Sequence, residues 1–144
     1  MNETQARVVL AAAIRNVGID PLTLPAELKP SAWLQGKNLE AYVNEAQAAI
    51  QAGVWRGGPL PHGYPAPAEA EPGACYWIMT PEGSVIFQYG SSPYSPDTPG
   101  LAPGALTAAN AEAAMRAHVR ALAEQAALAR LAQEYVAWVA GQML

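Results

Sequence analysis

The chain has 144 residues, a length typical of one domain, and 51% of them are hydrophobic. Its eight Lys and Arg residues against twelve Asp and Glu residues give a net charge of −4, so no basic stripe is available for phosphates and a nucleic-acid partner is not expected. The single cysteine, Cys75, excludes an internal disulfide and cannot form a metal site by itself.

No stretch of the sequence reaches 18 apolar residues, the length that a membrane-spanning helix requires. The apolar run from Val8 to Ile14 has the length of a signal-peptide core, but Arg15 ends it and no cleavage-type sequence follows. We therefore expect neither a signal peptide nor a membrane partner, and a location in the cytoplasm or in a virus particle.

Two helices are predicted near the N-terminus. Residues 3–17 place their apolar side chains on one face, which predicts an amphipathic helix with Gly18 as its cap. Three prolines then favour turns and one short helical turn. A second helix is predicted between an N-cap at Asn38 and Gly53. These elements predict a helical N-terminal unit over residues 1–56.

The composition changes between Gly57 and Gly104, where ten of the thirteen prolines and eight of the twelve glycines lie. This change predicts an extended arm over residues 57–104. Inside the arm, alternating apolar residues around the turn sequence Thr-Pro-Glu-Gly predict a two-stranded β-hairpin at about 75–89. No other segment is predicted to form a strand.

Strand alternation gives this hairpin two apolar faces. On the first strand, one face carries Cys75, Trp77 and Met79, and the other carries Tyr76 and Ile78. One face of the return strand is expected to carry Val85, Phe87 and Tyr89. Because a two-stranded hairpin is marginally stable alone, both faces need cover. We expect the N-terminal unit or the C-terminal helix to cover one face and a partner chain to cover the second.

A long helix is predicted over residues 105–144, which are rich in strong helix formers. The apolar stripe of its first half consists of Met115, Val119, Leu122 and Ala126. In the second half the apolar side chains lie about half a turn round the axis, and they are Leu128, Leu131, Tyr135, Trp138 and Val139. Either the helix breaks near Ala127, or it is continuous and its halves contact different bodies. The predicted fold class is therefore mainly α with a small β-hairpin (α+β).

The two histidines, His62 and His118, do not belong to a recognisable catalytic motif. A hydrolase built from His62 with Ser91, Ser92 or Asp97 would rest on spacing alone. Two distant histidines and one cysteine also lack the spacing of a metal-ligand set. We therefore predict no catalytic, cofactor-binding or metal site and expect the chain not to be an enzyme.

Two proline-rich segments, 57–73 and 90–104, favour polyproline II structure, which loses little conformational entropy on binding. Their aromatic anchors are Tyr64 and Tyr94, and the alternative is a pair of surface loops or linkers. Apolar residues of the hairpin and of the last helix complete the predicted interaction set, which is Tyr64, Trp77, Phe87, Tyr89, Tyr94, Leu131, Tyr135 and Trp138.

These features favour a non-enzymatic structural or adaptor subunit that is oligomeric or belongs to a larger protein assembly. Small subunits of virus particles, such as capsid-decorating or head-to-tail joining proteins, have the same general character. An alternative is a small inhibitor or immunity-type protein that binds a partner through its aromatic hairpin.

Overall fold

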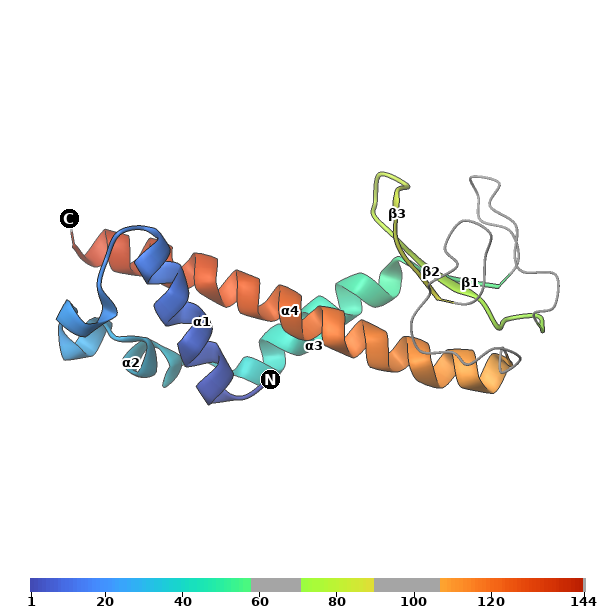
Figure 1. Ribbon diagram of the computed structural model, residues 1–144, viewed down its shortest axis with the longest axis horizontal. Helices are drawn as coiled ribbons and strands as arrows, with labels where there is room; N and C mark the ends of the chain where they lie inside the picture. The colour runs from blue at the N-terminus through green and yellow to red at the C-terminus, as the bar shows by residue number, and fades with distance from the viewer. Residues whose placement is uncertain (58–70, 90–106, 144) are drawn as a thin grey trace. The chain divides into compact units, whose positions relative to one another are not determined.

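The computed structural model describes residues 1–57, 71–89 and 107–143, and of residues 87–89 it describes the backbone (Figure 1). Its elements are the helices α1 (Glu3–Asn16), α2 (Pro30–Leu34), α3 (Leu39–Ala52) and α4 (Ala108–Gln142), the 3-10 helices η1 (Pro21–Thr23) and η2 (Ala26–Leu28), and the strands β1 (Val54–Arg56), β2 (Tyr76–Met79) and β3 (Val85–Tyr89). This mainly helical structure with a small antiparallel sheet confirms the predicted α+β class.

The chain divides into two compact units. Unit 1 comprises Met1–Ala46 and Ala123–Leu144, and unit 2 comprises Gln47–Leu122. The predicted boundaries of the extended arm stay a prediction, because residues 58–70 and 90–106 lie outside the described residues. None of the described helices combines the length and the apolar character that crossing a membrane requires.

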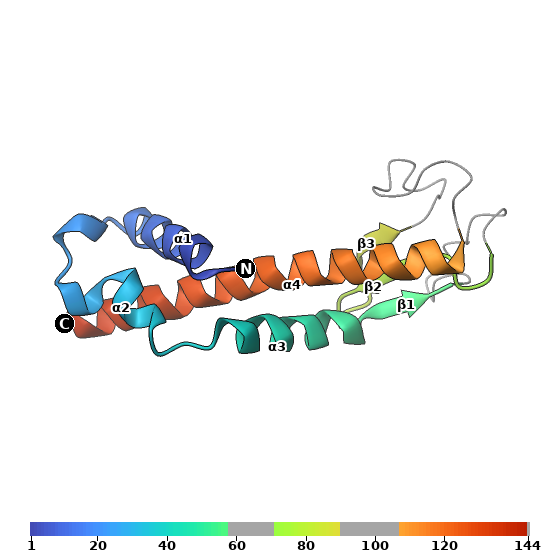
Figure 2. The same ribbon diagram turned by 90° about the horizontal axis from the view of Figure 1, so that it is seen from below.

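Unit 1 packs α1 and α2 beside the C-terminal half of α4 (Figures 1 and 2). The backbone N–H of Gln5 donates to the Asn2 side chain at 2.9 Å, and the predicted glycine cap is present at Gly18, which has φ +88°. The Trp33 and Tyr135 rings lie 5.4 Å apart between centroids, and the Tyr135 hydroxyl donates to the Leu28 carbonyl at 2.7 Å. The buried core consists of Ala6, Leu10, Ile14, Leu24, Trp33, Leu34, Leu131, Tyr135 and Val139.

Unit 2 contains a three-stranded antiparallel sheet with the strand order β1-β2-β3. The expectation that no segment outside the hairpin forms a strand was wrong, because β1 pairs with β2 with Trp55 opposite Trp77. β1 has three residues, too few for an alternating pattern to show in the sequence. It follows α3 directly, and Met79 N donates to the Gly53 carbonyl at 2.8 Å where the two elements join.

The predicted hairpin is present, but its return strand departs from simple alternation. Phe87 pairs with Ile78, whereas a register shift between Ile78 and Met79 places Val85 opposite Met79. Val85 packs with Trp77, so the return strand does not keep the simple alternation that was predicted from Val85 onward. A bulge of this kind cannot be recognised from the period-two pattern because it adds one residue to a single strand.

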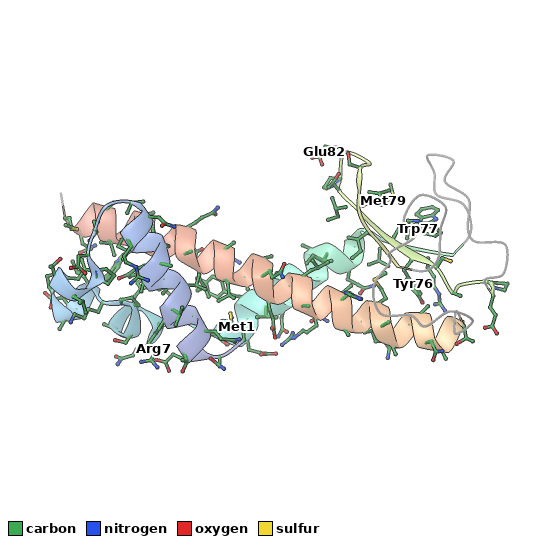
Figure 3. The ribbon with its side chains drawn as sticks, viewed as in Figure 1. Met1, Arg7, Tyr76, Trp77, Met79 and Glu82 are labelled. Atoms are coloured by element: carbon green, nitrogen blue, oxygen red, sulfur yellow. The ribbon has the colours of Figure 1, made fainter. Side chains whose placement is uncertain are left out.

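Both faces of β2 are buried within this chain, since Ala74, Cys75, Tyr76, Trp77 and Ile78 are each at most 4% exposed. One face packs against the first half of α4 through Tyr76 and Ile78, and Figure 3 shows Tyr76 pointing toward that helix and Trp77 pointing away. The face that was expected to need a partner chain holds Cys75 and Trp77, which the single chain already buries. The sheet therefore gives no argument for a partner at these two side chains.

Helix α4 is continuous, which decides between the two alternatives for the C-terminal segment. It begins at Ala108, whose backbone N–H donates to Glu71 at 3.1 Å, and the hydroxyl of Thr107 accepts from Asn110 N at 3.2 Å. Its two halves contact different bodies, both of them parts of this chain. The buried positions follow one another at intervals of four residues and are Ala111, Met115, Val119, Ala123, Ala127, Leu131, Tyr135 and Val139.

This four-residue spacing explains the apparent change of face along α4. At about 100° per residue, each step of four residues turns the buried line by about 40°, so it winds slowly round the helix. Ala123 and Ala127 connect the two halves of this line, and both are buried. The prediction that Ala126 belongs to the stripe was wrong, because its side chain is exposed.

Candidate binding groove in unit 2

A groove of about 370 Å³ lies where α3 ends and the sheet begins. It forms there because α3 passes into β1 without a loop, so the end of the helix meets the start of the hairpin turn. Its walls are mainly apolar and are made by Ala49, Ala52, Gly53, Val54, Trp55, Met79, Thr80 and Pro81. None of these described lining side chains is ionisable.

Trp55 is the largest side chain of this groove, and 44% of it is exposed. Alternation along β1 separates it from Arg56, whose guanidinium lies over the Tyr76 ring on the other face of the sheet. The other tryptophans are more buried than Trp55: Trp33 is 8% exposed and Trp77 is fully buried, while Trp138 packs partly buried against the unit 1 core. Trp55 thus presents an aromatic surface at the mouth of a preformed groove.

The turn that joins β2 to β3 holds the opposite rim of the groove in place. Thr80 N donates to the Ser84 carbonyl at 2.8 Å, and Gly83 N donates to the Thr80 carbonyl at 2.9 Å. The Thr80 hydroxyl also accepts from Ser84 N at 3.2 Å. Gly83 has φ +90°, a conformation that favours glycine, as the turn sequence predicted. Glu82 is exposed beside Pro81 in this turn (Figure 3).

A tyrosine and a glutamate in unit 2 form a polar contact next to the sheet. The Tyr76 hydroxyl donates to Glu112 of α4, and Arg116 lies 3.2 Å from the second oxygen of that carboxylate. Burial, followed by this hydrogen bond, raises the pKa of Tyr76, whereas the hydrogen bond from Tyr76 is the main cause that lowers the pKa of Glu112. At neutral pH the phenol is therefore a donor and the carboxylate an acceptor, so the pair holds α4 on the sheet.

Unit 1 contains a second contact of the same composition. The Tyr42 hydroxyl donates to the Glu134 carboxylate of α4. Arg130 Nε also donates to Glu134 Oε1 at 3.3 Å, and the Arg130 guanidinium forms an ion pair with Glu45. Burial is again the main cause that raises the pKa of Tyr42. The Arg130 guanidinium lies 4.6 Å from the centroid of the Tyr42 ring. Every group of this contact is paired, which indicates a role in holding α3 and α4 together within unit 1.

The predicted interaction residues fall into three groups. Tyr64 and Tyr94 lie outside the described residues, and the side chains of Phe87 and Tyr89 are likewise not described. Trp77 belongs to the interior of unit 2. The remaining residues belong to unit 1, where Leu131 and Tyr135 are fully buried and Trp138 packs partly buried against the core. Their role in association stays a prediction, while the structure gives the buried ones a role in packing.

Sequence reasoning missed Trp55 as a functional candidate because it took this residue as the end of the N-terminal helical unit. The signal that was available is the sequence Gly-Val-Trp-Arg, in which a tryptophan and an arginine must occupy opposite faces if the segment is extended. Burial raises the pKa of the Cys75 thiol, so this residue is a poor nucleophile. Among the described residues, no group of three or more His, Cys, Asp or Glu could hold a metal ion.

No protein-family model, no curated protein and no solved structure matches this chain. Any proposal about its function therefore has to follow from its own residues.

Proposed function

We propose that this chain is a non-enzymatic structural or adaptor subunit that binds another protein through the groove around Trp55. The observation that carries the proposal is the 44% exposure of Trp55 at the mouth of a preformed apolar groove. Tryptophan is enriched among the residues that dominate protein interfaces, because it buries a large area with few rotatable bonds. A chain that buries Trp33 and Trp77 gains nothing in stability from leaving this ring in water.

The chemistry of the groove supports binding over catalysis. Its lining side chains carry a single hydroxyl, that of Thr80, which accepts a backbone hydrogen bond within its own turn. Nucleophilic catalysis needs a hydroxyl or thiol next to a base, and none of the lining residues is a base. Membership of a virus particle is one form of such an assembly. The alternative of an inhibitor that binds through the hairpin has less support, because Trp77 is fully buried.

Replacement of Trp55 tests the proposal. The wild-type chain, Trp55→Ala and the control Ile86→Ala are each isolated from their native source, and co-isolated proteins are identified by mass spectrometry. Ile86 is a suitable control because it is 60% exposed in unit 2 and does not line the groove. A partner that binds wild type and Ile86→Ala is then purified and titrated by calorimetry. We expect Trp55→Ala to raise its Kd by about 30-fold or more, equivalent to about 2 kcal/mol.

Thermal melts followed by circular dichroism establish that the three proteins are equally folded. The proposal is wrong if every partner of the wild-type chain binds Trp55→Ala with the same affinity, or if the wild-type chain has no partner.

A further inference from the structure

The groove contains the C-terminal end of α3, through Ala49 and Ala52. The last carbonyls of an α-helix lack the partners that interior carbonyls have, and they give this end a partial negative charge. Gly53 N donates to the Ile50 carbonyl at 2.9 Å and closes the helix. The last turn of α3 contains no basic residue to offset the charge. This end of the groove therefore favours a cation.

Aromatic rings in this chain repeatedly carry a cation over one face. In the described residues, three rings do so within the distance at which a cation is attracted to the ring electrons. The pairs, with the distance from the cation to the ring centroid, are Lys37 over Trp33 (4.4 Å), Arg130 over Tyr42 (4.6 Å) and Arg56 over Tyr76 (5.8 Å). The Trp55 ring is more exposed than these three, and none of the three described cation–ring pairs involves it.

Two further properties of the groove suit a long basic side chain. Its methyl and methylene walls match the apolar stem of such a side chain, and long cationic residues bury their stems while their charged ends find polar partners. Glu82, which follows the lining residue Pro81 in the sequence, adds an exposed carboxylate to the hairpin turn. The chain as a whole carries a net charge of −4, which attracts a basic partner over longer distances.

We propose, on the basis of the proposed function, that the groove receives an arginine side chain of the partner protein. The guanidinium stacks on Trp55 and donates to carbonyls at the end of α3, while its stem lies against the apolar walls. Arginine fits better than lysine because its planar, weakly hydrated group stacks on aromatic rings and offers several donors at once. An uncharged apolar side chain would fill the walls but leave the helix end without a donor.

A pair of small probes tests the charge requirement. N-acetyl-arginine methylamide and its uncharged isostere, N-acetyl-citrulline methylamide, are titrated into the full chain, and the indole N–H signal of Trp55 is followed by NMR. We expect a saturable shift with the arginine probe and at least about tenfold weaker binding of the citrulline probe, since the isostere has no charge to interact with the ring or the helix end. In the variants the backbone amide signals of the groove residues are followed instead, and Trp55→Ala should abolish binding whereas Ile86→Ala should retain it. Equal binding of the two probes, or no binding of either, overturns the inference.

A random peptide library displayed on phage separates this inference from the proposed function. Selection on the wild-type chain, with Trp55→Ala as the comparison, should enrich Trp55-dependent peptides that share an arginine at a fixed position. If the Trp55-dependent peptides share an apolar residue or a lysine instead, the groove binds protein but the arginine assignment is wrong. If no enrichment depends on Trp55, the proposed function fails together with the inference.

Discussion

In units 1 and 2 the same type of polar contact holds the unit's own part of α4 in place, but the two units differ in the side chains that they leave exposed. In each unit a tyrosine hydroxyl donates to a glutamate of α4 that is bridged to an arginine four residues away. Unit 1 has a shallow hollow between α1 and α4. The side chains that line it are small or polar, with the exception of Val136. Unit 2 has the groove with the exposed Trp55. Under the proposed function, unit 1 serves mainly to hold the chain together and unit 2 binds the partner.

The largest expected loss of stability comes from a charge placed in the core of unit 1, and it tests the structural role of this unit. Leu131→Glu places a carboxylate at a fully buried site between α4 and the helices of unit 1, and an unpaired buried charge is strongly destabilising. We expect the amides of α1 to lose their protection in hydrogen exchange while those of β2 keep theirs. The matched control is Ala129→Glu, which changes an exposed position of the same helix. Full protection of α1 together with weaker self-association would instead favour a binding role for this half of α4.

The second prediction compares two tryptophans that face each other across the ladder of β1 and β2. Trp77→Ala should lower the free energy of unfolding of unit 2 by about 3–5 kcal/mol, because it empties a fully buried site. Trp55→Ala should lower it by less than about 1 kcal/mol, since its ring is largely in the groove and in water. Urea unfolding monitored by hydrogen exchange of β2 measures both. Equal losses would mean that Trp55 is part of the core, and the comparison between the units would fail.

The sequence predicted the elements whose signals are local. The caps at Gly18 and Asn38 lie where helix chemistry places them, and α3 ends just before Gly53 as predicted, although Gly53 does not adopt the positive φ of a left-handed cap. The missed features depend on pairing between distant residues. β1 is a strand only because β2 lies beside it, and the return strand departs from simple alternation only because of a bulge. The groove was missed for the same reason, because its walls come from two segments far apart in the sequence.

Alanine limited the prediction of α4 in a different way. Alanine has the same small apolar side chain on every face of a helix, so the pattern of large residues alone suggested a stripe that passes through Ala126. The buried line instead passes through Ala123 and Ala127. Small residues let neighbouring segments approach closely, and a sequence rich in alanine does not reveal which of them are used in this way.

The third prediction uses this pair of adjacent alanines. Ala127→Leu should cost about 1–3 kcal/mol, because a larger side chain at a fully packed position forces its neighbours to move. Ala126→Leu should change the free energy of unfolding by less than about 0.5 kcal/mol, since its side chain is exposed. Thermal unfolding of the two variants gives the difference directly. A greater loss from Ala126→Leu would restore the stripe expected from the large residues.

The smallest effect concerns the tyrosine contacts that both units share. Tyr76 is 4% exposed, so Tyr76→Phe removes the hydrogen bond of a buried hydroxyl, leaves Glu112 with the Arg116 bridge alone, and should cost about 1–2 kcal/mol at pH 7. Tyr42 is only half-buried and its glutamate keeps the bond from Arg130, so Tyr42→Phe should cost less than about 1 kcal/mol. Urea unfolding of the two variants at pH 7 compares these costs.

The pH dependence of stability separates the hydrogen bond of Tyr76 from simple packing. The pKa of Glu112 is lower in the folded chain than in the unfolded chain, with Tyr76 as the main cause. A group of this kind stabilises the fold above its unfolded pKa, and this stabilisation is lost as the pH falls through the folded value. Between pH 7 and pH 3, Tyr76→Phe should therefore lose less stability than the wild-type chain, so that their unfolding curves converge in acid. A difference that stays constant over this range would show that the hydroxyl acts independently of the charge on Glu112, and the contact would then be one of packing alone.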